Sequence, residues 1–348
     1  MVVLQSKKTG IADLPLHYGS APRWLFERMV KLSKPIATLI IEDYGSKEFL
    51  KRLSDPYWFQ AFGCVLGFDW HSSGLTTTVC GALKQAGLEE QGIKICGGKG
   101  KASLKTVEEI KKSELGEKKT EELIKASRLS AKVDNSCIQD GYELYHHVFV
   151  FDEKGCWSVV QQGMNEKNGY ARRYHWFSGE VKSFVEEPEK IACDKKEEKV
   201  LDLVSKKSKK AQKASLDALK EKDFLKLEKL RLPRQHSIML TAAEKKFLEK
   251  ISELDLKDYE ELVSLKGIGK KKLRALALTA ELVYGEKASW EDPVKYSFAH
   301  GGKDGIPYPV DRALYDDTVK FLEEAVEGSE IERKEKRLAL KRLREFIK

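Results

Sequence analysis

The sequence predicts an α+β fold, in which a mixed N-terminal domain with an antiparallel meander precedes an all-α domain. Over most of the chain, apolar residues recur at helical spacing, as at Leu25, Met29 and Leu32. From about residue 137 to 178 the period changes to two, which is typical of strands. After residue 240 the helical period returns. We therefore expect residues 1–192 to form the α+β domain and residues 239–348 a helical domain.

Length and composition indicate an intracellular chain of two or three domains. At 348 residues each domain could bury its own core. The polar N-terminus is no signal peptide, and no apolar run approaches the ~18 residues of a membrane span, so a cytoplasmic location is expected. The six cysteines form no CxxC pair and are expected to be reduced. The net charge of +8 is compatible with a polyanionic partner, and 34% charged residues would suit a thermophile surface.

Helices are predicted at the start of the N-terminal domain. Pro22 opens the first, which carries the stripe that begins at Leu25. The apolar run 35–45 fits either a buried strand or a helix, because periodicity does not separate them. Residues 46–53 form a helix that ends before Asp55, and residues 58–71 are expected as a strand. The next expected elements are a helix over 76–85, a strand and glycine-lysine loop over 92–103, and helices over 106–112 and 121–129.

Three strands with two turns make up the predicted meander, over residues 142–152, 156–164 and 171–178. If Phe151 pairs with Cys156, His146 lies opposite Gln161 and His147 opposite Val160. One face would then carry a polar row such as His146, Gln161 and Arg172, or its neighbours. Such a row is costly to bury without a use.

The chemistry of this polar row suits a phosphodiester. Arginine neutralises phosphate charge, and histidine acts as acid, base or metal ligand. Asp134, Asp140 and Glu143 are nearby in sequence and would offer carboxylates to a metal. The alternative is a solvated sheet face whose histidines and arginines pair with surface acids.

The stretch FDWHSSGLTTT holds a second candidate site. Asp69 and His71 are two residues apart, so on a strand they would share a face. They would bind a divalent metal, or act as a base and its orienting group. Ser72 and Ser73 would bind phosphate at the start of a helix. The alternative is a helix-capping serine beside a hydrogen-bonded core histidine.

Residues 261–283 read as a helix, a Gly-Ile-Gly turn and a second helix. The glycines permit a sharp turn and close approach to a ligand, and the amides at the second helix favour phosphate. This stretch resembles the helix-hairpin-helix motif, which grips the DNA backbone without reading sequence. An ordinary αα-hairpin with solvated lysines is the alternative. The predicted DNA-binding residues are Lys266, Gly267, Ile268, Gly269, Lys270 and Lys271.

A charged helical linker is predicted over residues 193–238, before the helical domain. Its SKKSKKAQK run is either a solvated face or a phosphate contact. Beyond the hairpin, a glycine-rich loop leads to a helix over 312–326 and to a basic final helix. The hairpin with the PVD segment also resembles base-excision DNA glycosylases, with Lys271 and Asp311 in the reacting positions. The spacing between these two residues is much longer than that family uses, which favours a phosphate contact for Lys271.

Across residues 10 to about 325, the chain resembles domain-of-unknown-function family 763 of archaea and thermophilic bacteria. The motifs that carry this resemblance are LPLHYGSAPRWLFERM, FDWHSSGLTTT, GGKG, LYHHVFVFD, VVQQGMN, ARRYHW and GGKDGIPYPVDR. The resemblance implies a metal-dependent nuclease with a helix-hairpin-helix tail.

The leading hypothesis is a DNA-binding nuclease that hydrolyses phosphodiester bonds with Mn²⁺ or Mg²⁺ as cofactor. Its predicted catalytic residues are Asp69, His71, His146, His147, Gln161, Arg172 and Arg173. The predicted metal ligands are Asp69, His71, His146 and His147. The expected partner is the DNA backbone, and no contact with a membrane is expected. A homodimer is one possible assembly of the chain. The alternatives are a DNA glycosylase and a non-enzymatic DNA-binding protein.

Overall fold

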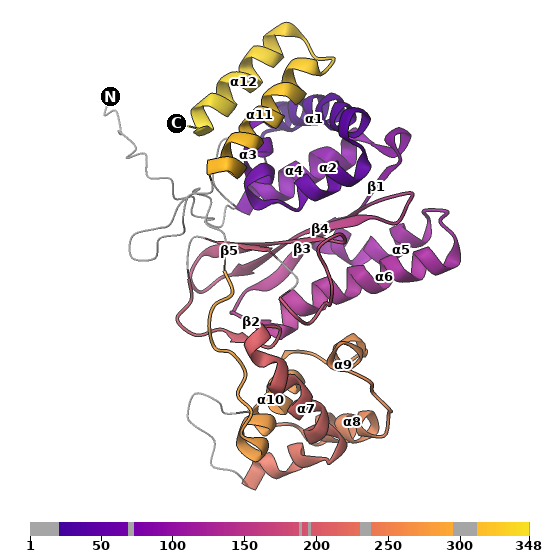
Figure 1. The fold of residues 1–348 in the computed structure, drawn as a ribbon, viewed down its shortest axis with the longest axis vertical. Coiled ribbons are helices and arrows are strands. Elements are labelled where there is room, and N and C mark those ends of the chain that lie inside the picture. Colours follow the sequence, from indigo (N-terminus) through magenta and orange to yellow (C-terminus); the bar gives the residue numbers. More distant parts are fainter. Residues whose placement is uncertain are drawn as a thin grey trace.

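A computed structural model describes residues 21–68, 73–187, 190–193, 196–229, 238–294 and 312–347. In these ranges, helices surround a central antiparallel sheet, so the predicted α+β class is confirmed (Figure 1). No helix within the same ranges combines the length and the apolar character that a membrane span requires.

Five strands form the main sheet, in the order β1-β3-β4-β5-β6, and every neighbouring pair is antiparallel. Their bounds are β1 (Ile93–Lys99), β3 (Glu143–Asp152), β4 (Trp157–Asn165), β5 (Tyr170–Phe177) and β6 (Lys190–Ala192). The predicted meander is β3–β4–β5, since these consecutive strands pair directly. A second, two-stranded sheet joins β2 (Ile138–Gln139) to β7 (Leu201–Asp202).

Four helices cover one face of the main sheet, which we term the α4 face (Figure 1). They are α1 (Arg23–Tyr44), α2 (Ser46–Leu53), α3 (Pro56–Leu66) and α4 (Ser73–Ala86). The ambiguous run 35–45 is therefore helical as far as Tyr44. The strand predicted from residue 58 is wrong, because residues 56–66 are helix α3. Asp55 caps this helix by accepting from the amides of Tyr57 and Trp58 at 2.8 and 2.9 Å.

The opposite face, the α6 face, is covered by α5 (Thr106–Lys111), α6 (Glu117–Lys132) and η3 (Val133–Cys137). Both faces are buried, so neighbouring residues of β3 belong to different cores. Val148 and Val150 pack with the helices of the α4 face, whereas Phe149 and Phe151 pack with α6.

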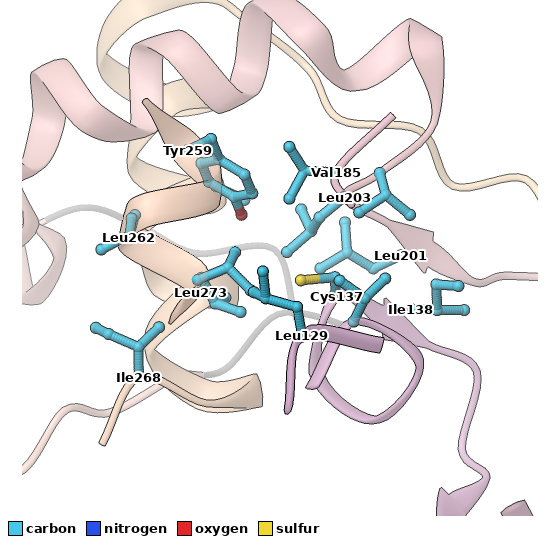
Figure 2. Packing of buried hydrophobic residues seen from close by; sticks show 14 of the residues in the cluster. Leu129, Cys137, Ile138, Val185, Leu201, Leu203, Tyr259, Leu262, Ile268 and Leu273 are labelled. Atoms are coloured by element: carbon cyan, nitrogen blue, oxygen red, sulfur yellow. The ribbon is translucent and has the colours of Figure 1, made fainter. Parts of the chain in front are cut away.

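Helices α7 (Lys209–Lys220), α8 (Ala242–Ser252), α9 (Tyr259–Ser264) and α10 (Lys270–Tyr284) gather beyond the α6 face (Figure 1). Figure 2 shows how this group joins the rest of the molecule. Leu273 lies beside Leu129 of α6, and both belong to one apolar cluster with Leu262, Ile268 and Leu201 of β7. Strand β7 and helix α7 lie within the expected linker, and α7 packs along α10.

The last two helices, α11 (Arg312–Gly328) and α12 (Arg333–Ile347), lie at the other end of the molecule (Figure 1). They pack against α1 and α3. Phe321, Leu322 and Leu343 share the core of the α4 face with Leu32 and Phe62. The segment expected as one helical domain is thus divided between two cores.

Gly97 of β1 offers a sharp test of this packing. Its φ is +91°, and a Cβ there would lie 2.2 Å from the backbone oxygen of His147 and 2.6 Å from Thr106 Oγ1. Gly100 has a positive φ of +57° but open space around its Cβ position. We expect G100A to lower the free energy of unfolding by about 1–2 kcal/mol, through backbone strain alone. G97A should lower the free energy of unfolding by about 1–3 kcal/mol more than G100A does, because strands β1 and β3 must move apart. Urea unfolding of both variants measures the difference, and equal midpoints would contradict the tight β1–β3 contact.

Candidate functional site

The pairing of β3 with β4 differs by one residue from the predicted register. Trp157, not Cys156, lies opposite Phe151. Cys156 stays in the turn, where its amide donates to Asp152 Oδ1 at 2.9 Å. Because side chains alternate along a strand, a shift of one residue moves each predicted partner to the other face. The predicted pairing of His146 with Gln161 is therefore wrong.

The observed register divides the candidate residues between the two buried faces. His147 and Gln161 are cross-strand neighbours on the α6 face. His146 lies opposite Gln162 on the α4 face, and Arg173 follows Gln162 in the same row. Adjacent strand residues point in opposite directions, so His146 and His147 cannot reach one metal ion, whose ligands lie within ~2–2.6 Å of it.

On the α6 face, four side chains form a continuous hydrogen-bonded chain. Ser127 Oγ lies 2.9 Å from His147 Nε2, and His147 Nδ1 lies 2.7 Å from Gln161 Oε1. The amide nitrogen of Gln161 donates to the carbonyl of Ser130 at 3.0 Å and to Asp134. Since the Gln161 oxygen accepts only, His147 carries its proton on Nδ1 and accepts from Ser127 at Nε2.

Burial disfavours a charge on either titratable group of this chain. All four side chains are buried. Burial lowers the pKa of His147 to about 4, although the hydrogen bond to Gln161 opposes the shift. Burial also raises the pKa of Asp134 well above its usual range, against the hydrogen bonds from Trp176 and Gln161. At neutral pH the imidazole is uncharged and oriented by fixed partners.

Arg172 lies on the same face, between two carboxylates. Its Nη1 is 3.0 Å from Asp140 Oδ2, and its Nη2 contacts Asp292. Asp140 also accepts from the hydroxyl of Tyr174 at 2.8 Å. The guanidinium is fully buried and its charge is compensated by these two acids. This arrangement ties β5 to the segment that follows α10.

The α4 face holds a second polar cluster. Arg173 Nε donates to His175 Nε2 at 2.8 Å, and its Nη2 donates to the carbonyl of Pro56 at 3.2 Å. Gln162 donates to the carbonyl of Ser73 at 2.9 Å and accepts from Thr76. These bonds fasten α3 and α4 to the sheet, because Arg173 reaches Pro56 of α3 and Gln162 reaches Ser73 and Thr76 of α4.

His146 differs from the other polar residues of the α4 face. It is 1% exposed, yet neither of its ring nitrogens has a hydrogen-bond partner among the described residues. Burial is the main cause that lowers its pKa to about 3, and nearby His147 and Lys99 act in the same direction. The neutral ring thus offers one donor and one acceptor, the arrangement of a metal ligand or a substrate contact.

Three predicted site residues lie outside the described part of the chain, namely Asp69, His71 and Asp311. Their roles stay predictions. Within the described ranges, no group of three or more His, Cys, Asp or Glu side chains is arranged to hold a metal ion.

The turn between α9 and α10, residues 265–269, is held firmly. Gly267 has a φ of +91°, and a Cβ there would lie 2.8 Å from the ring of Phe247, so glycine is required. Ile268 is buried in the shared core. Lys132 Nζ of α6 donates to the carbonyl of Leu265 at 2.5 Å. The turn therefore has a fixed position relative to α6.

The lysines around this turn differ in their pairing. Lys266 is exposed, and no ion pair involving it occurs among the described residues. Lys270 lies 2.5 Å from Glu143, and Lys271 lies 2.7 Å from Glu244 Oε2. Gly269 precedes α10 and supplies no side-chain cap, so the first amides of α10 receive no bond from it.

Sequence reasoning missed several members of the buried clusters, including Ser127, Gln162 and Thr76. The predicted register places Gln161 in the polar row with His146, so Gln162 is not among the predicted site residues. Ser127 and Thr76 lie on helices, and nothing local distinguishes them from ordinary buried hydroxyls.

The chain matches a known protein family over most of its length. A family model described as "Protein of unknown function (DUF763)" matches residues 10–310. Searches of curated proteins and of solved structures returned no match.

The lowered pKa of His147 predicts how stability depends on pH. The unfolded state protonates this histidine near 6.5, and the folded state near 4. The stability that the neutral ring contributes is therefore present above pH 6.5 and is lost as pH falls toward 4. The loss is about 1.4 kcal/mol per pH unit.

Between pH 7 and pH 5, we expect the free energy of unfolding to fall less for H147Q than for the wild-type protein. Urea unfolding at both values measures this difference, and a cooperative transition at pH 7 serves as the folding control. Parallel pH profiles for the two proteins would show that His147 does not titrate in this way.

Proposed function

This chain belongs to the DUF763 family of proteins of unknown function, and we propose from its geometry that it binds the DNA backbone without reading sequence. The observation that carries the proposal is the rigid, lysine-rich turn between α9 and α10.

Three properties of the turn favour phosphate. The first amides of α10 point out of the helix start, where partial positive charge gathers. A Cβ placed on Gly269 would meet no atom of the described residues within 4 Å, which favours close approach of a phosphate to the backbone. Lys266 and Lys271 are exposed beside it. Because this set reads only the backbone, binding should be independent of sequence.

The acids near the turn limit the affinity. Glu143 and Glu244 already pair with Lys270 and Lys271, so a phosphate must compete with both carboxylates. The pair with Glu244 also disfavours the glycosylase alternative. That reaction needs an uncharged lysine, whereas here a carboxylate holds the ammonium in place.

Phosphodiester hydrolysis with a divalent metal is a second candidate function, and His146 favours it. A buried imidazole whose two ring nitrogens find no partner among the described residues is costly unless a further group completes it. A bound metal would supply an activated water and polarise the phosphate. Imidazole is a poor ligand for Mg²⁺, which prefers oxygen, so His146 favours Mn²⁺ of the two metals. Arg173 and Gln162 would hold the neighbouring part of the sheet in place.

The pair between Glu244 and Lys271 gives a test of DNA binding. Glu244 completes the capping box of α8 with Thr241, and glutamine can keep that box. We expect E244Q to bind DNA more tightly, because it frees Lys271 and removes one negative charge. Fluorescence anisotropy with a labelled duplex, read over a series of salt concentrations, measures the affinity.

K266Q is the complementary variant. It should weaken DNA binding and lower the slope of log affinity against log salt concentration by about 1. Wild-type protein that leaves the duplex unbound at low salt would overturn the proposal. If E244Q and wild type bind the duplex with equal affinity, Lys271 does not contact the DNA.

The nuclease candidate is tested at His146. Wild-type protein is expected to cleave DNA with Mn²⁺, and H146Q should lose cleavage while it keeps the duplex affinity of wild type. Gel analysis of single-stranded and duplex DNA, with Mn²⁺ and with Mg²⁺, gives the readout. If the DNA stays intact in every wild-type reaction, the nuclease function is wrong and DNA binding alone remains. If H146Q cleaves as fast as wild type, His146 has no part in the cleavage.

A further inference from the structure

A groove lies along α6, beside the turn that joins α9 to α10. Its volume is about 380 Å³. Its lining residues come from the end of α5, one side of α6 and the end of α9: Lys111, Glu121, Ile124, Lys125, Arg128, Leu129, Lys132 and Ser264. The residues from α6 recur every three or four positions, so they form one stripe of the helix.

The groove has an excess of positive charge. Lys125 pairs with Glu260 at 2.9 Å, and Lys132 is bonded to the carbonyl of Leu265. Lys111 and Arg128 are exposed, and the described part of the chain shows no ion pair for either of them. A guanidinium in this situation is suited to phosphate, which it can contact through two parallel hydrogen bonds.

The floor of the groove is apolar. Ile124 and Leu129 lie between the cationic side chains and belong to the core that α6 shares with α9 and α10. Pockets for small ligands measure about 300–1,000 Å³, so this groove has room for a unit such as one nucleotide and not for a duplex. The cationic rim suits the phosphate of an unpaired nucleotide, and the apolar floor suits the face of its base.

The groove is also continuous with the turn. Ser264, the last residue of α9, lines the groove, and residues 265–269 follow it directly. Lys132 lines the groove and also holds Leu265. The groove and the turn therefore adjoin at Ser264 and share the contact that Lys132 makes.

We propose that the groove between α6 and α9 binds an unpaired nucleotide that flanks the DNA gripped by the turn. This inference rests on the proposed DNA binding and narrows its substrate to DNA with a single-stranded end. Arg128 and Lys111 contact the phosphate, and the base lies over Ile124 and Leu129.

The test compares a blunt duplex with the same duplex that carries a short single-stranded tail, by fluorescence anisotropy. Wild type should bind the tailed DNA more tightly. In the double variant K111Q/R128Q this advantage should be lost, while the affinity for blunt duplex stays unchanged. The salt slope for tailed DNA should fall by about 0.7 for each phosphate contact removed.

The matched control is K31Q. Lys31 is an exposed lysine of α1, on the other side of the sheet, and no ion pair involving it is seen in the described ranges. It should keep the tail advantage. Wild type that binds neither DNA would overturn the proposed function itself. Wild type that binds both equally, or a double variant that behaves like K31Q, would overturn this inference and leave backbone binding intact.

Discussion

Burial of the sheet on both faces determines the arrangement of the polar groups in this molecule. A strand covered on one side can turn its polar residues to water, but β3, β4 and β5 have no such side. Each histidine, glutamine and arginine on them must find a partner in the interior. Arg172 finds two acids, His147 finds Ser127 and Gln161, and Arg173 finds groups on α3 and on its own strand. Among the described histidines of these strands, His146 is the one with no partner at either ring nitrogen.

Much of the architecture could be predicted from local pattern. The period of two revealed the meander, and the helical period revealed the segments that became α9 and α10. The run after Asp55 was misassigned because it is apolar on all sides, and the capping by Asp55 outweighed its strand-like appearance. The register was misassigned because it depends on Asp152, whose side chain holds the amide of Cys156 in the turn. Both groups lie within five residues, but the residue types alone do not show which amide the carboxylate accepts from.

The candidate site could be predicted only as a set of residue types. The notion of a solvated sheet face for these histidines and arginines does not hold, since they are buried. Their division between two faces follows from tertiary packing. The turn near Gly267 was easier to predict, because its glycines and lysines are contiguous in the chain. Its attachment to α6 through Ile268 and Lys132 depends on residues more than a hundred positions apart.

The position of α11 and α12 has a consequence for how the protein is made. These helices complete the apolar layer that α1 and α3 begin, so the first and last described segments share one core. During synthesis at about 5–20 residues per second, the N-terminal helices wait for the last helix to leave the ribosome. Until then their apolar side chains stay uncovered. The nascent chain should therefore depend on chaperones for longer than its central sheet alone would require.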